Sequence, residues 1–155
     1  MERASRLRTS IATQPVFLYS LGENFRRYLP EAYLARCYPL RSLLKNGLEL
    51  ALSSDGPVVE DDNPFLGIQA AVLRRDPQGA TIAPEQTITV AQALYAYTMG
   101  GALACGDAFN RGSLSPGKWA DLVVLERNPL ESDPNALSEI GVERTYLGGE
   151  LVYER

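Results

Sequence analysis

The pattern of β-rich and helical segments changes at Gly112, and this change limits the folds that the chain can adopt. Before Gly112, β-rich runs alternate with helical segments, whereas after it only short β-rich runs and turns follow. Alternating strands and helices are typical of a parallel α/β structure, and closely spaced strands with turns indicate a small β module. We therefore predict two units, residues 1–111 and residues 112–155.

The first unit contains two predicted strands. Residues 9–18 are rich in Val, Ile, Thr and Phe, and residues 48–54 have leucines at alternate positions. Between them, residues 19–38 indicate a long loop with a short helix, and residues 39–46 predict a short helix that Gly47 ends. Two parallel strands alone cannot close a barrel, so this unit is expected to be part of a larger sheet.

Two helices are predicted after the second strand. The first spans residues 63–74, with Asn63 as its N-cap. After a polar loop, Thr89 caps a second helix with an alanine-rich face, which favours close packing. Gly100 and Gly101 are expected to break or bend this second helix.

The second unit has the spacing of a small antiparallel structure. A strand is predicted over residues 120–126, followed by a helical turn at residues 136–140. The chain finishes with two β-rich runs joined at Gly148-Gly149, a pair that is typical of a type I′ hairpin turn.

Histidine is absent from the 155 residues. Because histidine is the commonest zinc ligand and general base, the chain alone cannot hold a complete His-metal site or a Ser-His-Asp triad. The net charge of −4 disfavours nucleic acid as a partner. No apolar stretch approaches the roughly 18 residues that cross a bilayer. Cys37 and Cys105 form no CxxC pair, which favours a reduced, cytoplasmic setting over a disulfide scaffold.

The residue with the clearest chemical potential is Asp55, which follows the second predicted strand. Active sites of α/β barrels lie at this end of the strands, where a carboxylate can ligate a metal or act as a base. Aspartate before glycine is also a common turn residue that bonds its own backbone, so both roles stay open. Gln14 could bind substrate or serve a turn. Arg74 could face substrate, although the adjacent Arg74 and Arg75 are more simply both solvated.

Several motifs, in this order, resemble the amidohydrolase superfamily, above all the branch related to exoenzyme regulatory proteins. The stretch LELALSSDGPV is similar to the last barrel strand of that branch, which ends in Ser-Asp-Ala-Pro-Val. TQPVF resembles its seventh strand, and TVAQALYAYTMGGALACG resembles its Thr-Asn-Ala-Ala helix. GSLSPGKWADLVVLERNPL and LGGELVYE resemble its β module and terminal hairpin, so the resemblance covers nearly the whole chain.

The resemblance implies an α/β fold made of two parts. Residues 1–111 match the last βα units of a (β/α)8 barrel, and residues 112–155 match the carboxy-terminal strands of a small β-sandwich. In the family, the other strands of that sandwich come from the amino terminus of the chain. We therefore expect unpaired strand edges here, and association of the chain with itself or with an upstream fragment.

The resemblance also implies a reaction. Members use a divalent metal, expected to be zinc, to activate water that hydrolyses the C–N bond of an amide or cyclic amide other than a peptide. Asp55 matches the family aspartate that binds the metal or accepts a proton. The remaining family ligands, mostly histidines, would precede Met1, so this chain alone is expected to bind no metal and to be inactive.

A second class of function remains open on the sequence. The chain could be a non-catalytic remnant that binds a partner or a small molecule through the former barrel face. It could also be a truncation of a longer enzyme, and the sequence does not separate that from a short natural protein. The substrate cannot be read, because the loops that select it in such enzymes lie largely outside this chain.

Overall fold

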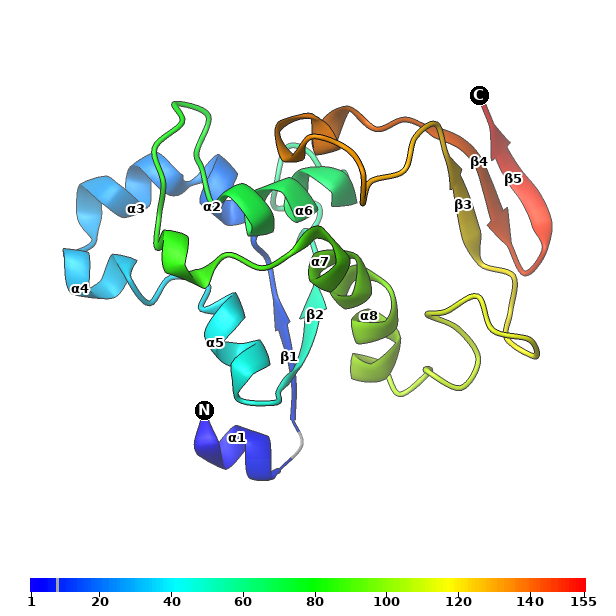
Figure 1. The fold of residues 1–155 in the computed structure, drawn as a ribbon, viewed down its shortest axis with the longest axis horizontal. Helices are drawn as coiled ribbons and strands as arrows, with labels where there is room; N and C mark the ends of the chain where they lie inside the picture. Colours follow the sequence, from blue (N-terminus) through cyan, green and yellow to red (C-terminus); the bar gives the residue numbers. More distant parts are fainter. Residues whose placement is uncertain (8) are drawn as a thin grey trace.

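The structure, a computed structural model, describes residues 1–7 and 9–155 and contains two sheets (Figure 1). Strands β1 (Ser10–Thr13) and β2 (Glu49–Leu52) form a parallel pair. Strands β3 (Leu122–Leu125), β4 (Val142–Leu147) and β5 (Glu150–Glu154) form an antiparallel sheet in sequence order. The parallel pairing predicted for the first part of the chain is confirmed.

Helices precede, separate and follow the two parallel strands. The helices are α1 (Glu2–Arg6), α2 (Val16–Ser20), α3 (Gly22–Tyr28), α4 (Glu31–Leu34), α5 (Leu40–Lys45), α6 (Pro64–Leu73), α7 (Val90–Tyr97) and α8 (Met99–Ala104), with 3-10 turns η1 (Pro84–Gln86) and η2 (Pro134–Glu139). None of the helices in the described residues is long and apolar enough to cross a membrane.

The core is centred on β2. Leu50, Ala51 and Leu52 are all buried, so this strand is covered on both faces, as a strand inside a parallel sheet is. Helices α5, α7 and α8 pack against it, and apolar side chains of α5, α6 and α7 complete the core. The alternation of leucines seen in the sequence therefore marks the strand correctly but does not separate a buried face from an exposed one.

The predicted helix starts are confirmed. The Asn63 side chain accepts a hydrogen bond from the Phe65 N–H at the start of α6. Thr89 and Gln92 form a reciprocal capping box at the start of α7. Gly47 has a φ of 67°, the left-handed conformation expected after α5.

Three boundaries differ from the sequence prediction. The first strand ends at Thr13 instead of residue 18, and Val16 and Leu18 are buried on helix α2. Residues 19–38 contain two further helices, α3 and α4, instead of one short helix in a loop. The long second helix breaks at Thr98, whose φ and ψ are −111° and −85°, and not at the glycine pair that follows.

The carboxy-terminal segment is divided between the core and the second sheet. Leu137 and Ile140, in and next to η2, are buried in the core cluster around β2, and η2 packs against α6. Strands β3, β4 and β5 lie apart from the parallel pair, at the side of the molecule opposite α3 and α4 (Figure 1). The hairpin turn has positive φ at both Gly148 (59°) and Gly149 (87°), as a type I′ turn requires.

Candidate functional site

The candidate site lies at the carboxyl ends of β1 and β2. Gln14 directly follows β1 and Ser53 directly follows β2. The Gln14 Nε2 donates a hydrogen bond to the Ser53 Oγ at 3.1 Å, and the Ser53 N–H donates to the Thr13 carbonyl at 3.1 Å. The ends of the two parallel strands are therefore joined by side-chain and backbone bonds.

Asp55 is the third residue after the end of β2 and is exposed. Its φ of 62° is left-handed, a conformation that aspartate tolerates better than most residues. The turn after it is closed by the Val58 N–H to the Asp55 carbonyl (2.9 Å) and by the Gly56 N–H to the Ser54 Oγ (3.2 Å). These turn bonds use Ser54 and the backbone, which leaves the Asp55 carboxylate out of them.

Two tyrosines near this strand end were not anticipated from the sequence. Tyr97 on α7 places its Oη 3.4 Å from the Ser53 carbonyl oxygen, and burial raises the pKa of Tyr97 to about 12. Burial also raises the pKa of Tyr38 to about 12, with smaller contributions from Cys37 and Asp55. Both phenols therefore stay protonated at neutral pH.

Arg74 occupies a structural position. It is fully buried at the end of α6, and its guanidinium donates to the carbonyls of Ile82 (2.8 Å), Tyr38 (3.0 Å) and Cys37 (2.7 Å). Burial lowers the pKa of Arg74 to about 10. The expectation that Arg74 is solvated is therefore wrong, and its donors are committed to the backbone, so this placement offers no support for a substrate contact. Of the two adjacent arginines, only Arg75 is exposed.

The described residues alone do not fit a metal ion. Across residues 1–7 and 9–155, no group of three or more His, Cys, Asp or Glu side chains is arranged to hold one. A zinc site needs three or four protein ligands, and Asp55 supplies one carboxylate at most.

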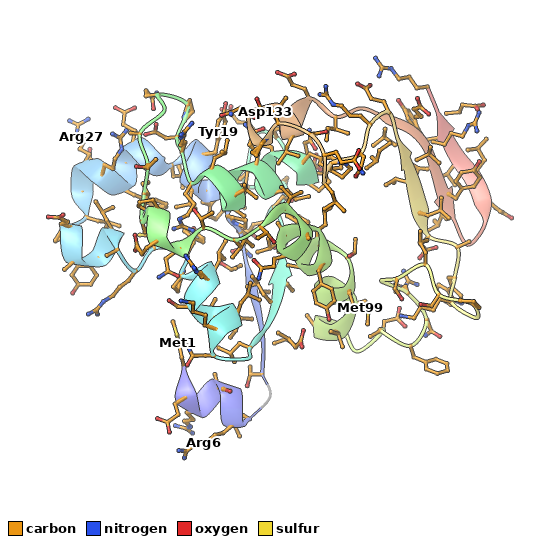
Figure 2. All side chains as sticks on the ribbon, in the orientation of Figure 1. Met1, Arg6, Tyr19, Arg27, Met99 and Asp133 are labelled. Carbon is orange, nitrogen blue, oxygen red and sulfur yellow. The ribbon has the colours of Figure 1, made fainter. Side chains whose placement is uncertain are left out.

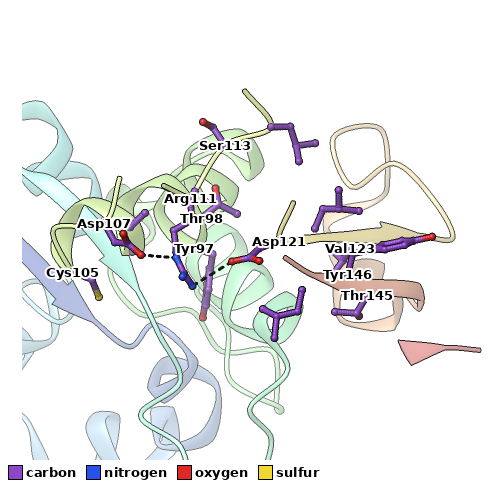
Figure 3. A pocket seen from close by; sticks show the side chains of 16 residues that line it. Tyr97, Thr98, Cys105, Asp107, Arg111, Ser113, Asp121, Val123, Thr145 and Tyr146 are labelled. Carbon is purple, nitrogen blue, oxygen red and sulfur yellow. Dashed lines mark ion pairs between the residues drawn. The ribbon is translucent and has the colours of Figure 1, made fainter. Parts of the chain in front are cut away.

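A cavity of about 970 Å³ lies between helices α7 and α8 and strands β3 and β4 (Figure 3). Asp55 is not among its lining residues. Within it, Arg111 forms ion pairs with Asp107 (2.6 Å) and Asp121 (3.3 Å), although the Arg111 Nε–H is not aligned for a hydrogen bond. The Arg111 guanidinium also lies 4.5 Å from the ring centre of Trp119. These contacts tie the segment after α8 to the residues just before β3 and have no evident catalytic geometry.

Known proteins resemble the chain over most of its length. The pattern of the Amidohydrolase family matches residues 1–153. An N-substituted formamide deformylase from Arthrobacter pascens is 34% identical over 155 residues, which cover 99% of this chain and 28% of that protein. Among solved structures, an uncharacterized metal-dependent hydrolase from Pyrococcus horikoshii has a TM-score of 0.75 and 29% identity, over 86% of this chain and 27% of that one.

An adenosine deaminase from Xanthomonas campestris, solved with bound zinc, has a TM-score of 0.57 and 26% identity over 73% of this chain and 27% of its own. The chain thus spans less than a third of the length of these proteins. The resemblance inferred from the motifs is confirmed across both predicted units. The chain belongs to the amidohydrolase family.

Proposed function

We propose that this chain forms the carboxy-terminal part of a metal-dependent hydrolase that acts on carbon–nitrogen bonds other than peptide bonds. The observation on which the proposal rests is the exposed Asp55 carboxylate at the carboxyl end of a buried parallel strand, where α/β barrels place their active sites. The names of two similar proteins, a formamide deformylase and a deaminase, both denote reactions at a carbon–nitrogen bond, which supports this class of reaction.

In the proposed enzyme, Asp55 works with groups that lie outside these residues. A bound divalent metal, which we propose to be zinc, supplies the activation of water. The Asp55 carboxylate serves as a ligand or accepts the proton of the attacking water and returns it to the leaving nitrogen. The substrate is a small amide or cyclic amide.

The fold supports a specific setting for this site. We propose that residues 1–111 are the last βα units of a (β/α)8 barrel and that residues 112–155 are strands of a β-sandwich. The parallel β1–β2 pair and the separate antiparallel sheet support this division, although η2 packs into the core of the first unit. Both cysteines are free, which supports the cytoplasmic location that we propose.

Asp55→Asn is expected to lower hydrolase activity by about a hundredfold in an enzyme completed by fusing or co-expressing the rest of a family chain, because it removes the proton acceptor. Asparagine also tolerates a left-handed φ, so the turn should persist and thermal unfolding should stay unchanged. The exposed Glu60→Gln in the same loop is the matched control.

The isolated chain gives the baseline for that assay. Because Asp55 is the one carboxylate that the isolated chain brings to the candidate site, we expect it neither to bind stoichiometric zinc nor to hydrolyse substrate. Full activity in the completed Asp55→Asn enzyme would remove Asp55 from the mechanism and favour a non-catalytic binding module derived from this fold.

We also propose that the second sheet is covered by another polypeptide. Its strands carry exposed large apolar side chains, and the sheet lies at the edge of the molecule (Figure 2). These residues are Val123, Leu147, Leu151, Val152 and Tyr153, each about half exposed or more. Its two edge strands, β3 and β5, have no further strand partner within the described residues. The occupant we propose is the remainder of a longer family chain, since the similar formamide deformylase is more than three times the length of this chain.

Sedimentation velocity tests whether another polypeptide covers the second sheet. The isolated chain is expected to self-associate with rising concentration, and Val123→Lys with Val152→Lys should shift it toward the monomer because charge on an edge strand opposes pairing. Adding an upstream family fragment should replace the self-associated species with a one-to-one complex. A chain that stays monomeric and takes up no fragment would contradict the proposal.

A further inference from the structure

Ser53 is held by three neighbours immediately before the candidate site. Its N–H donates to the Thr13 carbonyl at 3.1 Å, and its Oγ accepts from the Gln14 Nε2 at 3.1 Å. Its carbonyl oxygen lies 3.4 Å from the Tyr97 Oη. All three polar groups of Ser53 are thus engaged, one by the last residue of β1, one by the residue after it and one by helix α7.

The position of Tyr97 depends on a glycine in α6. A Cβ atom at Gly67 would lie 1.8 Å from the Tyr97 Oη, so the hydroxyl occupies the space that a side chain would fill. The 3.4 Å separation from Ser53 is longer than a typical O–H···O bond. Tyr97 therefore restrains the strand end by its fit against Gly67 as well as by the hydrogen bond.

We propose that Gln14 and Tyr97 are positioning residues that fix Asp55 through Ser53. The inference rests on the proposed function of Asp55. The turn from Ser54 to Val58 is closed by its own two bonds, so the place of the Asp55 carboxylate follows from where Ser53 is held. A catalytic group must stay within roughly 0.5 Å of its productive position, which gives such restraints a role beyond stability.

This role is distinct from the substrate contact and the turn that the sequence left open for Gln14. Its amide nitrogen is directed to Ser53, so the residue links the ends of two parallel strands. The same arrangement explains why Asp55, although exposed and in a turn, follows a rigid strand: β2 is buried, and its register with β1 is set by Ser10↔Glu49 through Thr13↔Leu52.

Amide hydrogen exchange in this chain tests the restraint without any need for activity. In Tyr97→Phe and in Gln14→Ala, the Ser53 and Val58 amides should exchange about three to ten times faster, the range expected for the loss of one hydrogen bond. The thermal midpoint should change little. Tyr95→Phe is the matched control, because Tyr95 lies on the same helix and is exposed. Wild-type exchange at both amides in both variants would overturn the inference.

The completed enzyme gives the second readout. Both variants should lower kcat by about three- to tenfold with KM unchanged, the result expected when a catalytic group is misplaced and substrate binding is intact. Ser53→Ala should reproduce Gln14→Ala, and Ser53→Thr, which keeps the hydroxyl, should restore kcat. An equal rise in KM would overturn the positioning role.

Failure of the positioning inference can be distinguished from failure of the proposed function. If Asp55→Asn leaves activity intact while the exchange rates respond, the restraint on the strand end stands and the proposed function falls. If Asp55→Asn abolishes activity while exchange and kcat ignore Tyr97 and Gln14, the positioning inference falls and the proposed function stands.

Discussion

Gly100→Ala is expected to destabilise the chain by about 3 kcal/mol, because helix α8 packs directly on the backbone of β2. A Cβ at Gly100 would lie 2.1 Å from the Leu50 carbonyl oxygen and 3.1 Å from its carbonyl carbon. Neither atom can yield easily, since Leu50 is 2% exposed and its strand is hydrogen-bonded to β1. The helix or the strand would therefore have to move as a unit.

The next residue supplies the matched control. A Cβ at Gly101 meets nothing within 4 Å, although it lies on the same helix. Gly101→Ala should therefore stabilise the chain by about 0.5–1 kcal/mol through helix propensity alone. Urea unfolding measures both changes as shifts of the midpoint at constant slope. Equal effects of the two substitutions would show that α8 does not contact β2 as the structure has it.

This pair also shows where sequence reasoning stops. Two adjacent glycines predict a bend, yet α8 runs through them. The break falls two residues before Gly100, at Thr98, whose Oγ1 donates to the Leu94 carbonyl at 2.8 Å. A glycine is required at position 100 because the Leu50 carbonyl of β2, about 50 residues away in the sequence, lies against it. No local sequence pattern can reveal such a contact. Helix starts were predictable because a cap such as Thr89 depends only on residues within one turn.

The same distinction applies to the candidate site. Asp55 could be singled out from the sequence because the carboxyl end of a parallel strand is where α/β barrels place their active sites. Its supports could not: Tyr97 reaches Ser53 across 44 residues, and its fit depends on Gly67 in a different helix. The first strand was predicted to extend to residue 18, and this was wrong. Its β-prone residues Val16 and Leu18 are buried in helix α2, where tertiary packing outweighs intrinsic propensity.

Arg74→Met is expected to cost about 3 kcal/mol, the second large effect, because Arg74 satisfies three carbonyls from two separate segments. Two of them, from Cys37 and Tyr38, belong to the connection between α4 and α5, and the third belongs to Ile82 before η1. Methionine fills a similar volume but donates nothing. Part of the loss is offset, since the guanidinium no longer has to be buried, a cost evident in its pKa of about 10.

Arg75→Met separates this effect from a general loss of charge. Arg75 is the neighbour of Arg74 and is exposed, so its substitution should change the free energy of unfolding by no more than about 0.5 kcal/mol. Arg74→Lys should fall between the two, because one ammonium cannot reproduce the spread of three guanidinium bonds. Arg74 has a φ of 54°, but arginine, lysine and methionine share that strain, and it cancels in the comparison. If urea unfolding gave the same stability for Arg74→Met and Arg75→Met, the three carbonyl bonds would contribute nothing beyond the cost of burying the charge.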